Sequence, residues 1–308
     1  MTQNCILIGA PMDAGKRRRG CVMGPDALRT AGLVEAIEAM GHSVADTGDV
    51  APVEVDVPMP EGSKVHALAE NVGWTMALAD AAQTHAPHGM PIFLGGDHAL
   101  ALGTVSGMAA HHAMMGTPFF VLWLDAHSDI HTPATSASGN LHGTPVGYVT
   151  GRPGFEAFPP LEAVVDPANI CMIGLRSVDR PEHDLLLEME IDAVDMRMID
   201  ETGIRAPLAA FLDRVRAAQG VLHVSLDVDF LDPSIAPAVG TTVPGGATMR
   251  EAHLVMEILC DSGLVGSLDL VELNPFLDER GKTALLMVDL VASLLGRRIF
   301  DRPTRQNG

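Results

Sequence analysis

The chain has 308 residues, with 39 acidic and 20 basic side chains, so its formal charge is −19 at pH 7. This charge argues against a nucleic-acid partner, because proteins that bind the phosphate backbone need a basic surface. A hydrophobic content of 47% exceeds that of a disordered chain, yet no apolar run approaches the roughly 20 residues of a bilayer span. We therefore expect a folded protein without a membrane segment, and no signal peptide is recognisable at the N-terminus.

The cysteines lie too far apart in the sequence to form a Cys-x-x-Cys pair. They are Cys5, Cys21, Cys171 and Cys260. This spacing favours free thiols over a disulfide framework or a thiolate zinc site. Because free thiols are typical of a reducing compartment, we expect a cytoplasmic protein.

Apolar runs of strand length alternate with stretches of helical periodicity. In chain order, strands are predicted at Cys5–Ile8, Ile92–Leu94, Phe119–Leu124, Cys171–Ile173, Val221–Leu226 and Leu268–Val271. Helices are predicted over residues 63–84, 184–190, 206–217 and 250–261, the last beginning at Thr248 or Met249. The runs are apolar nearly throughout, as in strands that are covered on both faces, so the alternation predicts a parallel sheet between helices. The connectors 51–62 and 151–169 are predicted to be surface loops, and residues 1–308 one domain.

Polar residues directly follow five of the predicted strands. The segments are Gly95–His98, Asp125–Asp129, Arg176–Asp179, Asp227–Asp229 and Glu272–Pro275. In parallel α/β sheets, ligands bind outside the carboxyl ends of the strands. One such cluster would be ordinary turn chemistry, but five at one edge predict a common site.

Carboxylates and imidazoles recur in this predicted site with a spacing of two residues, which places them on one face of an extended chain. The candidate ligands are His98, Asp125, His127, Asp129, Asp227 and Asp229. Four buried carboxylates would repel one another without cations, and six ligands suit two bridged ions better than one. An oxygen-rich set without thiolates favours two Mn²⁺ ions, with Fe²⁺, Co²⁺ or Zn²⁺ as alternatives.

Other polar residues have ordinary explanations when each is taken alone. Glu272 follows a strand in the same register as the ligands, but an isolated glutamate there is more often a surface or capping residue. His142 is equally well explained as a loop histidine that bonds to the backbone. The basic run Lys16–Arg19 is predicted to be a solvated loop, with the entrance of the site as the alternative place for it.

Three of the segments resemble the signature segments of the ureohydrolases, which are manganese enzymes that hydrolyse guanidino groups. They are Gly95–His98, Asp125–Asp129 and Ser225–Pro233. Within this superfamily the chain most resembles the arginase family, because Arg19–Arg29, Ser136–Gly143 and Asp269–Pro275 also match its pattern. The resemblance runs from Gly9 to about Gly296. It implies a three-layer α/β/α fold with a central, mostly parallel, eight-stranded sheet, a homotrimer or homohexamer, and conversion of L-arginine and water to L-ornithine and urea.

The resemblance also implies a role for each site residue. One ion would be held by His98, Asp125, Asp129 and Asp227, and the other by Asp125, His127, Asp227 and Asp229. A hydroxide bridging the ions would attack the guanidinium carbon, and Asp129 would pass a proton to the leaving amine. His142 would shuttle protons, and Glu272 would pair with the guanidinium.

Further positions match contacts of the substrate's amino-acid end. Ser136 and Ser138 correspond to contacts of the α-carboxylate, Asp179 and Glu182 lie near the α-amino group, and Thr241 lies in a loop beside the site. The usual Asp-Ile-Asn of the family is Asp129-Ile130-His131 in this chain. His131 therefore stands where an asparagine normally helps to bind the α-carboxylate, and an imidazole can also donate a hydrogen bond.

The nearest alternative is another amidinohydrolase, such as an agmatinase or guanidinobutyrase, which shares the metal site without needing both α-groups. Formimidoylglutamate hydrolysis is disfavoured because few basic residues could meet the additional carboxylate of that substrate. A metal-dependent deacetylase would not need Glu272, and a non-catalytic scaffold is disfavoured because every expected catalytic position is filled. A dinucleotide-binding enzyme is disfavoured because residues 9–15 do not spell Gly-x-Gly-x-x-Gly.

Overall fold

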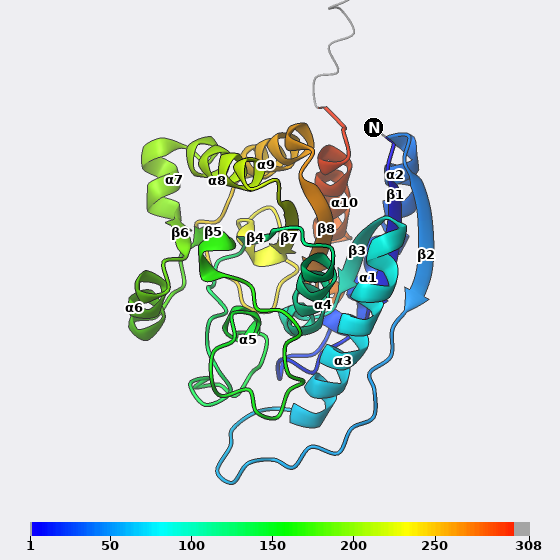
Figure 1. The fold of residues 1–308 in the computed structure, drawn as a ribbon. Helices are drawn as coiled ribbons and strands as arrows, with labels where there is room; N and C mark the ends of the chain where they lie inside the picture. Colours follow the sequence, from blue (N-terminus) through cyan, green and yellow to red (C-terminus); the bar gives the residue numbers. More distant parts are fainter. Residues whose placement is uncertain (1, 299–308) are drawn as a thin grey trace, which may run out of the picture.

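Residues 2–298, which the computed structural model describes, form ten α-helices around one eight-stranded sheet (Figure 1). The strands are β1 (Asn4–Ala10), β2 (Ser43–Asp49), β3 (Met90–Gly95), β4 (Phe119–Leu124), β5 (Ile170–Leu175), β6 (Asp192–Asp195), β7 (Val221–Asp227) and β8 (Val265–Val271). The helices are α1 (Gly24–Thr30), α2 (Leu33–Ala39), α3 (Leu68–His85), α4 (Ala101–Met114), α5 (Pro145–Val149), α6 (Arg180–Glu188), α7 (Met196–Thr202), α8 (Arg205–Ala217), α9 (Met249–Ser262) and α10 (Lys282–Leu294).

All neighbouring strands of the sheet pair in parallel, in the order β2-β1-β3-β8-β7-β4-β5-β6. The carboxyl ends of the strands therefore meet at one edge of the sheet, which faces the bottom of Figure 1, where the β2 arrow points. The predicted three-layer architecture with a parallel eight-stranded sheet is confirmed.

The core lies on both faces of the sheet. In β4, Leu122 and Leu124 pack on the side of α8, α9 and α10, whereas Val121 and Trp123 pack on the side of α3, α4 and α5. Both sets are almost completely buried. Coverage on both faces explains why the central strands read as continuous apolar runs rather than as an alternating pattern.

All six predicted strands are confirmed, but β2 and β6 were not predicted. Both lie at the edges of the sheet, where one side of the strand has no partner. The side chains of β2 are mostly exposed, and β6 has only four residues, two of them aspartates. Such strands carry no apolar signal because they bury little side-chain surface.

Two predicted helices begin at different residues from those expected. The helix predicted at 63–84 begins at Leu68, because Ala67 adopts a left-handed conformation with φ 47° and separates it from the preceding loop. The helix predicted at 184–190 begins four residues earlier, because Asp179 caps it and Pro181 occupies its first turn. Helix α8 matches its prediction closely.

Helix α9 also matches its prediction. Thr248 caps it, and the side chain of Glu251 accepts the Thr248 N–H in return. The predicted loop at 51–62 is confirmed, and most of its side chains are exposed. The predicted surface loop at 151–169 is not simply on the surface, because Phe155 and Phe158 are buried against Tyr148.

The four cysteines are free thiols, as predicted. Within residues 2–298, no helix combines the length and the apolar character needed to cross a bilayer.

Candidate metal centre

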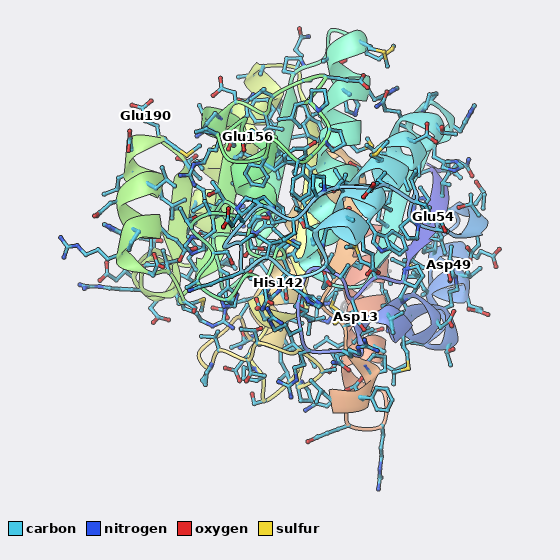
Figure 2. The ribbon with its side chains drawn as sticks, turned by 90° about the horizontal axis from the view of Figure 1, so that it is seen from below. Asp13, Asp49, Glu54, His142, Glu156 and Glu190 are labelled. Carbon is cyan, nitrogen blue, oxygen red and sulfur yellow. The ribbon has the colours of Figure 1, made fainter. Side chains whose placement is uncertain are left out.

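The chemically reactive side chains gather at the carboxyl edge of the sheet. Asp125 directly follows β4, Asp227 ends β7, and Glu272 directly follows β8. Figure 2 views the molecule from this side and places His142 near the middle of the face, with Asp49 and Glu190 towards opposite sides. The residues therefore occupy the place that strand order and parallel pairing predict.

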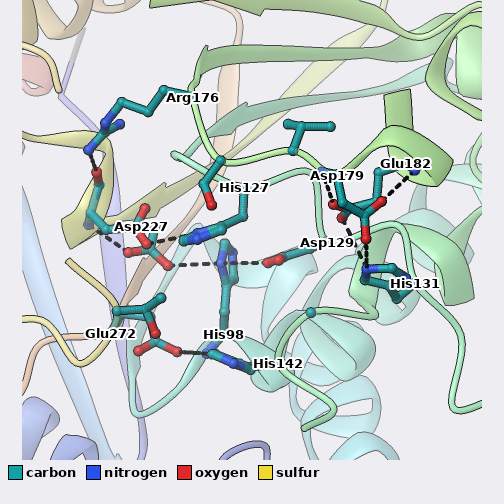
Figure 3. Close-up of a pocket in the computed structure, with 15 residues that line it drawn as sticks. His98, His127, Asp129, His131, His142, Arg176, Asp179, Glu182, Asp227 and Glu272 are labelled. Atoms are coloured by element: carbon teal, nitrogen blue, oxygen red, sulfur yellow. Dashed lines mark hydrogen bonds and ion pairs between the residues drawn. The ribbon is translucent and has the colours of Figure 1, made fainter. Parts of the chain in front are cut away.

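The first group of ligand-capable atoms surrounds His98, just after β3. Its Nδ1 atom lies 3.0 Å from Oδ2 of Asp125, 3.2 Å from Oδ2 of Asp129 and 3.1 Å from Oδ2 of Asp227. Figure 3 shows this imidazole between the carboxylates of Asp129 and Asp227. All four side chains are buried.

The second group surrounds His127. Its Nδ1 atom lies 3.0 Å from Oδ2 of Asp229 and 3.4 Å from Oδ1 of Asp125. The two oxygens of Asp125 thus face different imidazoles, and this carboxylate joins the two groups. Asp227 touches the second group through its other oxygen, Oδ1, which accepts the backbone N–H of Asp229 at 2.7 Å.

The backbone around these residues is held in tight turns. Asp125 accepts the N–H of His127 at 2.7 Å, two residues on, just as Asp227 accepts that of Asp229. Asp129 adopts φ 47° and Glu272 φ 68°, which are left-handed backbone conformations that residues other than glycine rarely adopt. Strain of this kind persists where the surrounding structure imposes it, and it is concentrated at functional sites.

His98 is oriented by groups on its other side. Its Nε2 atom lies 2.8 Å from the hydroxyl oxygen of Ser225 in β7. The ring of Trp123 stacks on the imidazole with centroids 4.2 Å apart, and its indole N–H donates to Oδ2 of Asp125 at 3.0 Å. A bond to the second ring nitrogen fixes the tautomer of a histidine that ligates metal, and the orientation of its ring.

The electrostatics of the two groups require compensating positive charge. Burial raises the pKa of Asp229 to about 6, and burial and neighbouring carboxylates also raise those of Asp129 and Asp227. Burial disfavours the imidazolium form of His127, but the carboxylates outweigh burial and raise its pKa to about 12. Within residues 2–298, no lysine or arginine forms an ion pair with these carboxylates. The Nδ1 atom of His98 is buried and lacks a hydrogen-bond partner of good geometry, so the donor set fits divalent cations.

Glu272 lies beside this centre and is also buried. Its Oε1 atom accepts the backbone N–H of His98 at 3.0 Å and lies 3.1 Å from Nδ1 of His142, which Figure 3 shows. Its Oε2 atom forms an ion pair with Lys16. Burial raises the pKa of Glu272, but Lys16 and His142 outweigh burial and hold the pKa well below its ordinary value.

A cavity of about 430 Å³ opens over the two groups. Its wall includes the predicted contacts His131, Asp179, Glu182 and Thr241, together with both histidines of the metal centre, His142 and Glu272. Ser136 and Ser138, which were predicted as substrate contacts, are not among the residues that line it. Ser136 donates to the carbonyl oxygen of Asn140 at 3.0 Å, within its own loop.

Asp179 and Glu182 form a capping box at the start of α6. Asp179 accepts the N–H of Glu182 at 2.9 Å, and Glu182 accepts that of Asp179 at 2.8 Å. The Nε2 atom of His131 lies 3.6 Å from Asp179 and 3.5 Å from Glu182. The two carboxylates are therefore fixed by a helix start, and the imidazole faces both.

Sequence reasoning assigned no chemical role to two residues of the site. Arg176 lines the cavity and donates to the carbonyl oxygens of Gly174 and Val243 at 3.1 and 2.7 Å, so it ties two loops together. Its position directly after a predicted strand was the available signal. Lys16 was predicted to lie in a solvated loop, with the entrance of the site as the alternative. The solvated loop is wrong for this residue, because its side chain is 2% exposed.

Comparisons with known proteins show which family the chain is similar to. The family model described as the arginase family matches residues 3–296. The chain is 58% identical to an arginase of Brucella melitensis, over 98% of this chain and 99% of that protein. It is 40% identical to an arginase of Bacillus subtilis over 97% and 100%. The structure superposes on the arginase of Bacillus caldovelox with a TM-score of 0.88 at 36% identity, covering 97% of this chain and 100% of the other.

Proposed function

The chain belongs to the arginase family of hydrolases, and we propose that it hydrolyses L-arginine to L-ornithine and urea at a binuclear manganese centre. The observation that carries the proposal is the pair of histidine–carboxylate groups that share Asp125. One carboxylate with each oxygen in a different group is what a bridging ligand provides.

The assignment of the metal ligands follows these groups. The first ion would be held by His98, Asp125, Asp129 and Asp227, and the second by Asp125, His127, Asp227 and Asp229. Two divalent cations in these positions would lower the pKa of a water between them and so supply hydroxide near neutral pH. The oxygen-rich donor set favours Mn²⁺, with Fe²⁺, Co²⁺ and Zn²⁺ as alternatives.

Glu272 would bind the guanidinium of the substrate. A buried carboxylate that stays ionised forms strong, charge-assisted hydrogen bonds with a guanidinium, in which two N–H groups meet two oxygens. Glu272 meets this requirement because Lys16 and His142 lower its pKa. It would place the guanidinium carbon above the metal groups, where a nucleophile can reach it.

Two residues would move protons. Asp129 reaches the first metal group through Oδ2, and its carboxylate would carry a proton from the attacking water to the leaving amine. The side chain of His142 is 21% exposed at the cavity wall, so it can exchange protons with solvent. Burial disfavours its charged form, but Glu272 outweighs burial and raises the pKa of His142, which suits a proton donor.

The amino-acid end of L-arginine would lie against the rim of the cavity. Asp179 and Glu182 would attract the α-ammonium group, while His131 and Thr241 would contact the α-carboxylate. Ser136 and Ser138 remain proposed contacts of the α-carboxylate. Since they do not line the cavity, the contact would form through a movement of their loop or through a bridging water.

We also propose a single domain, a homotrimer or homohexamer and a cytoplasmic location. The eight strands of one sheet extend from residue 4 to residue 271, which supports one domain. Free thiols support a reducing compartment. The charge of −19 supports the absence of a nucleic-acid partner.

A second candidate function is hydrolysis of a guanidine that lacks one α-group, such as agmatine or 4-guanidinobutyrate. The observation that favours it is His131, which faces Asp179 and Glu182. An imidazole within 3.6 Å of both carboxylates stands where they would meet an α-ammonium group, which favours in particular a guanidine without that group, such as 4-guanidinobutyrate.

Urea release from L-arginine, agmatine and 4-guanidinobutyrate distinguishes these functions when Mn²⁺-loaded and chelated protein are assayed in parallel. The proposal predicts Mn²⁺-dependent turnover with L-arginine as the preferred substrate. Preference for agmatine or 4-guanidinobutyrate would retain the metal chemistry and replace the proposed substrate. Equal rates with and without chelator would contradict the metal assignment.

A further inference from the structure

A buried lysine lies behind the carboxylate that is proposed to bind the guanidinium. Among the lysines and arginines of residues 2–298, Lys16 is the one that is buried. Its ammonium group forms an ion pair with Oε2 of Glu272, whose side chain is 3% exposed. The neighbouring Arg17, Arg18 and Arg19 are all exposed. One member of this basic run is therefore buried, although desolvating an ammonium group is unfavourable.

The hydrogen bonds of Glu272 divide evenly between its two oxygens. Lys16 occupies one acceptor place on Oε2, and the backbone N–H of His98 occupies one on Oε1. A carboxylate offers about two places on each oxygen. The second place on each oxygen is taken by His142, 3.1 Å from Oε1, and by the thiol of Cys21, a weak donor 3.9 Å from Oε2. The fork of a guanidinium would replace these two contacts.

The backbone directly before Lys16 is held in place by Asp97. This buried aspartate accepts the backbone N–H of Gly15 at 2.8 Å and that of Ala99 at 3.0 Å. Gly96 permits this arrangement, because a Cβ atom there would lie 2.0 Å from the carbonyl oxygen of Met12. The loop after β1 and the turn after β3 are thus packed directly together.

Lys16 and Glu272 form a buried pair of opposite charges. Burial and the neighbouring Glu272 raise the pKa of Asp97 to about 7, so Asp97 adds a negative charge to this pair only when it is ionised. Burial disfavours the charge on Lys16, but Glu272, Cys21 and Asp97 outweigh burial and raise its pKa above the ordinary value.

We propose that Lys16 is a positioning residue, which fixes the carboxylate of Glu272 from behind so that its two oxygens face the substrate's guanidinium. This inference rests on the proposed role of Glu272. Lys16 is not among the residues that line the cavity, so it acts through Glu272 rather than on the substrate. A looser carboxylate would still attract a guanidinium, but it would hold the reacting carbon less accurately.

The test compares Lys16→Met and Lys16→Gln with Arg17→Met in Mn²⁺-loaded protein. Arg17 is a matched control because it is an exposed cation of the same loop. Lys16→Met should lower kcat for L-arginine by about 10- to 100-fold and change KM less, since a small misplacement costs turnover more than binding. Lys16→Gln keeps a donor and should recover part of kcat, whereas Arg17→Met should match the wild type.

A double variant separates positioning from general stability. In a Glu272→Gln background, Lys16→Met should change kcat by less than about twofold, because the carboxylate it positions is already gone. The proposal would be overturned if the loss of kcat in the double variant were the product of the losses in the two single variants. It would also be overturned if Lys16→Met had the kcat and KM of the wild type. If melting shows that Lys16→Met does not fold, Lys16→Gln carries the same comparison.

The wild type keeps the two proposals apart. If the wild type is active on L-arginine and the Lys16 variants have the same kcat and KM as the wild type, the result contradicts the inference alone. If the wild type prefers another guanidine, the proposed substrate fails and the Lys16 comparison is made with that guanidine. If the wild type releases urea from none of the three guanidines, the role of Glu272 and the inference fail together with the proposed function.

Discussion

The imidazole of His98 lies 3.0 Å from the carboxylate of Asp125, although these residues follow different strands and both are 1% exposed. The two strands, β3 and β4, are separated in the sheet by β8 and β7. The site is therefore assembled across the centre of the sheet from four strand ends. Burial of so many ionisable groups is unfavourable unless a bound ion compensates for their charge.

Metal removal should destabilise the protein as well as inactivate it. Chelation leaves the buried carboxylates without cations, so the melting temperature should fall by several degrees and recover when Mn²⁺ is added. Thermal melting of Mn²⁺-loaded, chelated and reloaded protein measures this change. Identical melting curves for all three samples would indicate that no structural cations are bound here.

Loss of one proposed bridging carboxylate should release metal. Asp227→Asn should bind fewer than two ions per chain and lose at least about 100-fold in activity, because an amide is a weak bridging ligand. Elemental analysis after dialysis gives the metal content. Asp213→Asn, which changes an exposed carboxylate on α8, is the control and should keep both ions. An Asp227→Asn protein that keeps both ions and full activity would refute the ligand assignment.

Glu272→Gln should separate substrate binding from metal binding. The variant keeps the size of the side chain but loses the negative charge, so kcat/KM for L-arginine should fall by about 100-fold or more. Metal content should stay at the wild-type value, because Glu272 is assigned to the guanidinium and not to the ions. A parallel loss of metal would show that this carboxylate belongs to the metal centre.

His131→Asn should change the discrimination between substrates. Removing the imidazole frees Asp179 and Glu182 for an α-ammonium group, so KM for L-arginine should fall several-fold, as for one gained charged hydrogen bond. KM for 4-guanidinobutyrate, which lacks the α-amino group, should change little. The ratio of kcat/KM for the two substrates is the measurement, and an unchanged ratio would place His131 outside substrate recognition.

His112 should make the protein sensitive to acid at a point remote from the site. Burial, assisted by the charges of His111 and His223, lowers the pKa of His112 to about 4. Since its pKa in the unfolded chain is higher, the unfolded state binds the proton first, and this group's contribution to stability is lost as the pH falls. The contribution of His112 to the free energy of unfolding is fully present above its pKa in the unfolded chain. It is lost progressively as the pH falls from that value to about pH 4.

The measurement for His112 is the melting temperature from neutral pH to about pH 4. The curve of His112→Gln should fall less steeply with decreasing pH than that of the wild type. His111→Gln, next to it on α4, serves as the comparison. Parallel curves for His112→Gln and the wild type would show that His112 does not stay neutral in the folded protein.

The central strands and the ligand set could be predicted because they share one cause. A strand covered on both faces must be apolar throughout, so a polar residue such as Asp125 or His98 marks the point where the strand ends. The edge strands β2 and β6 lack this contrast, since their residues are exposed and mixed. Their existence depends on pairing with β1 and β5, which is a tertiary property.

Lys16 shows a different limit of sequence reasoning. A run of four basic residues is typical of a solvated loop, and three of the four are exposed. Nothing within the run distinguishes the residue that turns inward. That choice is set by Asp97 and Glu272, which are 81 and 256 residues away in the sequence, so only the folded chain reveals it.

The central claim is that two ions at the shared carboxylates support hydrolysis of L-arginine. Its most direct test is to titrate metal-free protein with Mn²⁺ while measuring urea and ornithine formed from L-arginine. The account predicts that activity rises until two ions are bound per chain and that urea and ornithine form in equal amounts. Activity that saturates at one ion, or that persists without metal, would contradict it.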